Sequence, residues 1–230
     1  MSRLDIVALA AAMDQTLLKP TVGFSAGAAW IEENRDRGFA SLCVSPFLVP
    51  IAAQRLAGTR TAVCSVAAFP LGYANTESKA EESVHLVNLG CVEVDMVVNI
   101  AALLEREDEF VRDDIAAVVD AVGEASGGLA IVKVILETGY LSEDDIARGC
   151  TLAVEAGADF VKTSTGFGPR GASVRDVEIM RATVGPEIGV KAAGGIRNLE
   201  TALAMLDAGA TRLGTSAGSE IVAEAAAREL

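Results

Sequence analysis

The chain has 230 residues, a length that accommodates one domain, or two small ones, around an ample hydrophobic core. Hydrophobic residues make up 51% of it and charged residues 22%, a composition typical of packed globular proteins and not of disordered chains. The formal net charge of −13 would repel a phosphate backbone and an anionic membrane surface. Nucleic-acid binding and membrane association are therefore disfavoured.

The cysteines and the single histidine argue against a metal site. The four cysteines form no CxxC pair, and the only histidine is His85, so a zinc site is not expected. The apolar stretch at residues 6–13 is flanked by Asp5 and Asp14 and is too short to span a bilayer. We expect a cytoplasmic protein with reduced thiols.

Apolar runs of strand length recur along the chain between longer stretches of helical pattern, which predicts a parallel sheet covered by helices. The predicted strands cover residues 41–44, 61–67, 92–100, 130–136, 159–163, 188–192 and 211–214, and residues 12–18 supply an eighth candidate. Glycine precedes several of these strands directly after a helical stretch, where a left-handed residue ends a helix. The glycines concerned are Gly38, Gly90, Gly157 and Gly209.

The spacing of these glycines predicts the number of structural units. The intervals are 52, 67 and 52 residues, each long enough for two strand–helix units. Eight units of roughly 28 residues fill the chain, which predicts a single-domain (β/α)8 TIM barrel over residues 1–230. An open, doubly wound sheet remains an alternative because periodicity does not report closure. However, the glycine-rich fingerprint that such a fold needs after its first strand is absent.

Three lysines, Lys133, Lys162 and Lys191, each follow a valine inside an apolar predicted strand. A single such lysine would suit an edge strand or a side chain reaching for water, but a barrel has no edges. Lys162 and Lys191 are followed by turns of small residues, which places them at the carboxyl ends of strands, where barrel enzymes hold their chemistry. Two amines in a dry pocket disfavour each other's charge, and a neutral lysine amine is the nucleophile that forms a Schiff base with a carbonyl.

Carboxylates and glycines complete the candidate site. Asp95 lies in an apolar strand and is equally suited to a structural or a catalytic role, and the same holds for Asp14 and Thr16. The glycine-rich turns at residues 193–196 and 214–218 follow the seventh and eighth strands, where backbone N–H groups of barrel enzymes commonly bind phosphate. The segment 166–171 is predicted to be a mobile loop over the substrate, with Arg170 or Arg197 available to neutralise charge.

Seven motifs in chain order carry a family resemblance: DQTLL (14–18), FPLG (69–72), EVDMV (93–97), KVILETG (133–139), GADFVKTSTGF (157–167), VKAAGGIR (190–197) and GTS (214–216). With these motifs the chain resembles the deoxyribose-phosphate aldolase family. The resemblance implies a class I aldolase, a lyase that needs no metal or other cofactor. It would reversibly cleave 2-deoxy-D-ribose 5-phosphate to acetaldehyde and D-glyceraldehyde 3-phosphate, in deoxyribose phosphate catabolism.

The resemblance also implies roles for individual residues. Lys162 would form the Schiff base, Lys191 would lower its pKa through like-charge proximity, and Asp95 would join a proton relay with Lys191 through water. Asp14, Thr16 and Lys133 would support the site. The phosphate would be held at four positions: Gly194, Gly195, Gly214 and Ser216.

Other functions stay open from the residues alone. The chain could be a Schiff-base aldolase or transaldolase of another sugar phosphate, or a non-catalytic barrel that binds a sugar phosphate. A metal-dependent aldolase is disfavoured, because His85 lies on a helical stretch and is expected to be solvated. The expected ligand is a small phosphorylated sugar or aldehyde, and the resemblance implies a homodimer.

Overall fold

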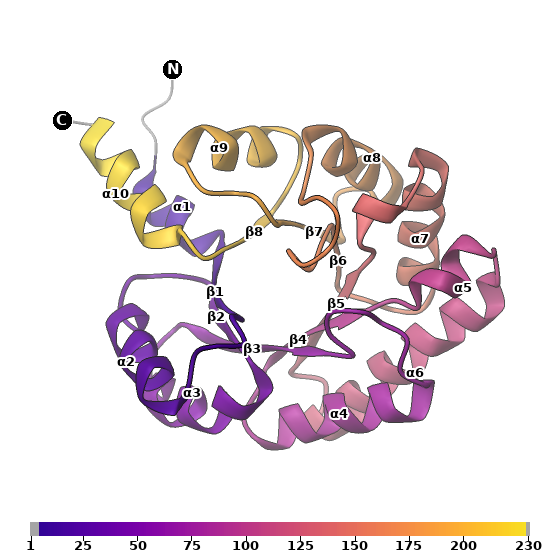
Figure 1. Ribbon diagram of the computed structural model, residues 1–230, viewed down its shortest axis with the longest axis horizontal. Coiled ribbons are helices and arrows are strands. Elements are labelled where there is room, and N and C mark those ends of the chain that lie inside the picture. Colours follow the sequence, from indigo (N-terminus) through magenta and orange to yellow (C-terminus); the bar gives the residue numbers. More distant parts are fainter. Residues whose placement is uncertain (1–4, 229–230) are drawn as a thin grey trace.

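Eight parallel strands pair in chain order, and the first pairs with the last to close a barrel (Figure 1). The computed structural model describes residues 5–228. The strands are β1 (Met13–Leu17), β2 (Ser41–Val44), β3 (Ala62–Ala67), β4 (Glu93–Val97), β5 (Ile131–Ile135), β6 (Phe160–Lys162), β7 (Gly189–Ala193) and β8 (Arg212–Thr215). Closure by the pairing of Met13 with Leu213 confirms the predicted barrel and excludes the open sheet.

Helices surround the strands in a ring, and α1 lies beside α10 where the ring closes (Figure 1). They are α1 (Ile6–Ala11), α2 (Phe24–Asn34), α3 (Val49–Leu56), α4 (Thr76–Asn88), α5 (Ile100–Leu104), α6 (Asp108–Ser126), α7 (Glu143–Glu155), α8 (Val174–Val184), α9 (Leu199–Asp207) and α10 (Gly218–Arg228), with short 3-10 helices at Pro46–Leu48 and Thr138–Tyr140. In the part of the chain that the structure describes, no helix combines the length and the apolar character needed to cross a bilayer.

Local sequence explains where the helices begin and end. Asn75, Ser142, Ser173 and Asn198 each precede a helix, and each side chain accepts a hydrogen bond from a backbone N–H of the first turn. The four glycines predicted to end helices all have positive φ, between 79° and 108°. These caps deliver the chain to each strand at a defined position.

One predicted strand is too long. The apolar run at residues 92–100 suggested a strand throughout, but β4 ends at Val97 and α5 begins at Ile100. The Asn99 side chain accepts a hydrogen bond from the N–H of Ala102 at 3.1 Å, and this cap starts the helix. The apolar residues after Asn99 therefore belong to a helix, and the strand stops at the barrel mouth.

The core is aliphatic, as a composition with 4% aromatic residues requires. Valine, leucine, isoleucine and methionine side chains fill the space between the barrel and its helices. The inside of the barrel differs, because fully buried charged side chains lie there. These charges are the basis of the candidate site.

Candidate active site

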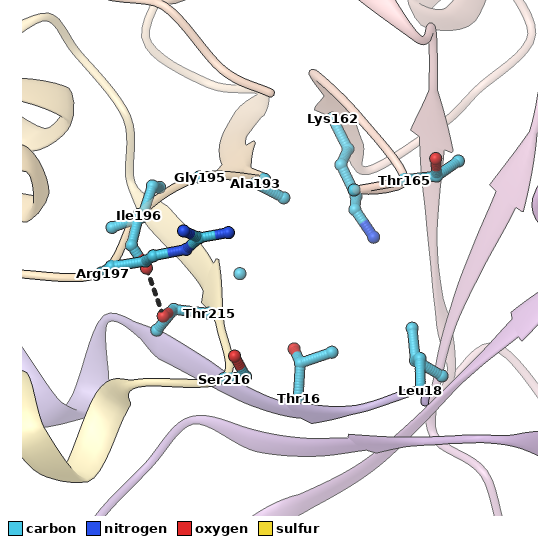
Figure 2. A pocket seen from close by; sticks show the side chains of 13 residues that line it. Thr16, Leu18, Lys162, Thr165, Ala193, Gly195, Ile196, Arg197, Thr215 and Ser216 are labelled. Atoms are coloured by element: carbon cyan, nitrogen blue, oxygen red, sulfur yellow. Dashed lines mark hydrogen bonds between the residues drawn. The ribbon is translucent and has the colours of Figure 1, made fainter. Parts of the chain in front are cut away.

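A cavity of about 190 Å³ opens at the carboxyl ends of the strands, where barrel enzymes hold their substrates. Its walls come from β1 and from the loops after β6, β7 and β8. Figure 2 shows Lys162 reaching into this cavity above Thr16 and Leu18, with Arg197 and Ser216 at the other end. The cavity thus has an amine at one end and hydroxyl and guanidinium groups at the other.

Lys162 is the last residue of β6, and its strand partner on β7 is Lys191. Lys162 is 3% exposed and lines the cavity, whereas Lys191 and Lys133 are fully buried beneath it. The expectation that Lys191 ends its strand is wrong, because β7 continues two residues further to Ala193. Of the three strand lysines, Lys162 is therefore the one that a ligand in the cavity meets.

Asp95 connects the three lysines. Its Oδ2 accepts hydrogen bonds from the Nζ atoms of Lys162, at 2.7 Å, and Lys191, at 2.6 Å. Its Oδ1 accepts one from Nζ of Lys133 at 2.9 Å. The family resemblance implied a water molecule between Asp95 and Lys191, but the two groups are in direct contact. A proton can therefore pass between Lys162 and Lys191 through one carboxylate oxygen.

A second row of charges lies deeper in the barrel. Nζ of Lys191 lies 2.5 Å from Oδ2 of Asp14, whose Oδ1 accepts a hydrogen bond from Nη1 of Arg212 at 2.5 Å. Nζ of Lys133 lies 2.6 Å from Oε2 of Glu93, and Arg212 also reaches Glu93 at 3.4 Å. These contacts join β1, β4, β5, β7 and β8 into one charged network.

The electrostatics of the network keep its deeper members ionised. Burial alone would raise the pKa of Asp95, but Lys133, Lys162 and Lys191 outweigh it and hold this pKa well below its usual range. Burial alone would lower the pKa of Lys191, but Asp14 and Asp95 outweigh it and raise this pKa above the ordinary value. The carboxylates thus offset the expected repulsion between the two amines, and Lys191 is held as an ammonium ion.

The other end of the cavity suits an anion. Gly194 and Gly195 have φ of 88° and 80°, a conformation that favours glycine, and both residues line the cavity. Gly214, Ser216 and Arg197 line the same end. The structure therefore brings together all four residues predicted to hold phosphate, and of the two candidate arginines it places Arg197 beside them.

A hydrogen bond ties the two phosphate-end loops to each other. Oγ1 of Thr215 donates to the carbonyl of Ile196 at 2.7 Å, the dashed line in Figure 2. The same Oγ1 accepts a hydrogen bond from the N–H of Ala217 at 2.9 Å. The loops after β7 and β8 are thus held as one cradle.

The loop 166–171 is anchored by charged groups on both sides. The Glu137 carboxylate accepts hydrogen bonds from the N–H of Thr165, at 3.2 Å, and from its hydroxyl. Nη2 of Arg170 donates to Oδ1 of Asp176 at 3.1 Å. Arg170 is therefore engaged in a structural ion pair outside the lining of the cavity, and Arg197 is the arginine that faces a ligand.

Three charged residues of this region were missed from the sequence: Glu93, Glu137 and Arg212. Strand alternation offered a signal for two of them, because Glu93 shares a face with Asp95 and Arg212 shares one with Gly214. Glu137 gave no such signal, since it lies after β5 with φ of 57°. Its burial depends on the loop that folds over it.

Two sets of possible metal ligands lie in the barrel: Cys43, Cys64 and Asp95, and Asp14, Cys64 and Glu93. The ammonium group of Lys133 already lies among these atoms. It donates hydrogen bonds to Cys64 at 3.5 Å, to Glu93 at 2.6 Å and to Asp95 at 2.9 Å. A lysine therefore supplies the positive charge that a metal ion would bring to these ligands.

The chain matches an aldolase family and is similar to known aldolases over nearly its whole length. Residues 8–224 match the family described as DeoC/LacD family aldolase. The deoxyribose-phosphate aldolase of Bacillus subtilis (strain 168) is 50% identical over 216 residues, which cover 94% of this chain and 95% of that protein. Deoxyribose-phosphate aldolase 2 of Bacillus licheniformis is 52% identical over 213 residues, which cover 93% and 94%. The tetrameric deoxyribose phosphate aldolase from Aeropyrum pernix has a structure that matches with a TM-score of 0.86 at 31% identity, covering 96% of this chain and 92% of that one.

Proposed function

Because this chain belongs to the DeoC/LacD family of aldolases, we propose that it cleaves 2-deoxy-D-ribose 5-phosphate reversibly through a Schiff base on Lys162. The products are acetaldehyde and D-glyceraldehyde 3-phosphate, and the enzyme is a class I aldolase, a metal-independent lyase. One observation carries the assignment of Lys162: it is the strand lysine that lines the cavity, while Lys133 and Lys191 lie beneath it.

The first step forms the covalent intermediate. The neutral amine of Lys162 attacks the C1 aldehyde, and loss of water from the carbinolamine leaves an iminium ion. Asp95 accepts hydrogen bonds from Lys162 and Lys191 through the same oxygen. This pair is placed to protonate the departing hydroxyl and to take a proton back.

The second step breaks the carbon–carbon bond. The C3 hydroxyl loses its proton to the Asp95–Lys191 pair, the C2–C3 bond breaks, and its electrons form an enamine with the iminium carbon. D-glyceraldehyde 3-phosphate leaves, and C2 takes a proton from the same pair. Water then hydrolyses the new iminium ion, which releases acetaldehyde and the free amine of Lys162.

The remaining cavity residues bind the rest of the substrate. Backbone N–H groups at Gly194 and Gly195 after β7 and at Gly214 near the end of β8 receive the phosphate, together with the Ser216 hydroxyl and the Arg197 guanidinium. Thr16 lines the cavity between the phosphate end and Lys162 and contacts the sugar hydroxyls. Asp14 and Lys133 hold the charged network in place below.

Incubation with acetaldehyde and borohydride tests this proposal. We expect the mass of one ethyl group on Lys162 in a peptide map, and no adduct in Lys162→Ala. Lys79 is an internal control, because it is fully buried but pairs with Asp114 outside the cavity. Cleavage by Lys162→Ala, or an adduct on another lysine, would contradict the assignment. Activity is expected to persist with a chelator, and a panel of other sugar phosphates tests the substrate.

We further propose a cytoplasmic homodimer. All four cysteines are free and buried, a state that a reducing compartment preserves. The rings of Phe24 and Phe47 pack edge to face with their centroids 5.0 Å apart, yet the two residues remain 63% and 45% exposed. Apolar side chains that are buried between subunits of a dimer are exposed in this way when one chain is considered alone. Light scattering on the purified protein measures the mass, and a monomer at micromolar concentration would contradict the dimer.

A further inference from the structure

The charged network beneath the cavity has more cations than carboxylates. Its carboxylates are at most 7% exposed: Asp14, Glu93 and Asp95. Four cationic side chains contact them: Lys133, Lys162, Lys191 and Arg212. An unbalanced charge is costly in a buried site, so the folded protein is stabilised by releasing one proton from this network.

The contacts indicate which cation gives up its proton. Arg212 cannot, because a guanidinium group keeps its charge in proteins. Lys191 contacts Asp14 and Asp95, and Lys133 contacts two carboxylates as well. Lys162 contacts one carboxylate oxygen, that of Asp95, and shares it with Lys191. Lys162 is therefore the least compensated cation of the network.

We infer that Arg212 is a positioning residue for the reaction, a fixed cation that leaves Lys162 as the neutral amine of the network. Arg212 lies next to Lys191 across the strand pair and reaches Asp14 at 2.5 Å and Glu93 at 3.4 Å, so it acts without contacting the substrate. Its charge completes the balance of the three carboxylates with Lys133 and Lys191. This inference rests on the proposed function, because it explains how Lys162 becomes a nucleophile.

Other titratable groups near Lys162 do not alter this balance. Burial raises the pKa of Cys64 well above the ordinary thiol value. A hydrogen bond with Cys64 lowers the pKa of Cys43, an effect that burial opposes, and both are counted as neutral thiols. Glu137 is bound to Thr165, and Arg197 faces the phosphate end of the cavity. Both lie outside the network of contacts described above.

Two single variants and their combination test the inference with opposite signs. In Arg212→Gln the network lacks one cation, so its charges balance without the loss of a proton. We expect the acidic limb of the kcat/KM profile to move up by about one pH unit. In Glu93→Gln the network lacks one carboxylate, and the limb moves down by a similar amount. The double variant restores the balance and returns the limb to its wild-type position.

The rate of acetaldehyde trapping by borohydride on Lys162, measured against pH, reports the same shift directly. Arg212→Lys retains the positive charge, so we expect the acidic limb of its kcat/KM profile to stay at the wild-type position. A merely structural role of Arg212 would instead lower activity by one factor at every pH. If Arg212→Gln alone fails to fold, the upward shift of the limb in the double variant relative to Glu93→Gln still isolates the effect of the Arg212 charge.

Unchanged limbs in the folded variants, or shifts of the same sign in both single variants, would overturn the role of Arg212. Absence of any wild-type adduct on Lys162 would overturn the proposed function instead.

Discussion

Replacing Asp95 by asparagine removes the carboxylate that lies between the amino groups of three lysines. The amide keeps the shape of the side chain but leaves the lysines short of one negative charge, at 2.6, 2.7 and 2.9 Å. Breaking a buried ion pair typically costs about 3–5 kcal/mol. The network can limit this loss by releasing one more proton, which costs about 4 kcal/mol for an ordinary lysine near pH 7.5. We therefore expect the free energy of unfolding to fall by about 3–4 kcal/mol.

The pH dependence of this loss has a definite sign. The folded variant carries one fewer lysine proton than the folded wild type, while lysines in both unfolded chains remain protonated below about pH 10. The unfolded variant therefore binds the additional proton, and the stability of the variant rises with pH relative to the wild type. The difference in the free energy of unfolding between wild type and variant should narrow by up to about 1.4 kcal/mol per pH unit between pH 7 and 10.

Urea denaturation at several pH values measures both quantities. Asp114→Asn is the matched control, because Asp114 is 1% exposed and pairs with fully buried Lys79 at 2.7 Å between α4 and α6. Both variants should lose stability, but only Asp95→Asn should lose activity, by about 100-fold or more. A stability loss below about 1 kcal/mol in Asp95→Asn, or a difference independent of pH, would refute the reasoning.

Three further substitutions probe the cavity walls. Alanine at Gly214 would place a Cβ 3.1 Å from Cε of Lys191, so we expect adduct formation in the borohydride assay to slow about tenfold. Arg197→Ala should raise KM for the phosphorylated substrate about 10- to 100-fold, by loss of charge-assisted hydrogen bonds, and leave unphosphorylated 2-deoxyribose unaffected in the same steady-state assay. Glu137→Gln weakens the anchor of Thr165, so limited proteolysis should cut the loop 166–171 faster while the Tm of the barrel changes little.

The architecture could be predicted from sequence because each of its signals is local. Gly38, Gly90, Gly157 and Gly209 end helices through their own backbone conformation, and their spacing reveals the repeating unit. Lys162 and Lys191 were conspicuous because lysine is rare in apolar strands. Local signals do not predict that the barrel closes, since closure depends on the pairing of β1 with β8, which lie at opposite ends of the chain.

The charged network could be predicted only in part, because its contacts join strands far apart in sequence. The stagger of all eight strands determines which residues of β1, β4 and β8 lie at the same level inside a barrel. Alternation alone places Arg212 inside, but it does not show that the guanidinium meets Asp14 and Glu93. The same limit applies to the direct contact of Asp95 with Lys191, where the family resemblance implied a water molecule.

The ion pair of Asp14 with Arg212 has a consequence for biosynthesis. It joins the first and last strands of the barrel across 198 residues of chain. A nascent chain that has not yet exposed Arg212 leaves Asp14 without this partner and the β1 edge unpaired. The network that we propose to set the charge of Lys162 is therefore complete only when the last strand docks. Unfinished chains would then carry no reactive amine to condense with cellular aldehydes, so chemical reactivity arises together with the finished fold.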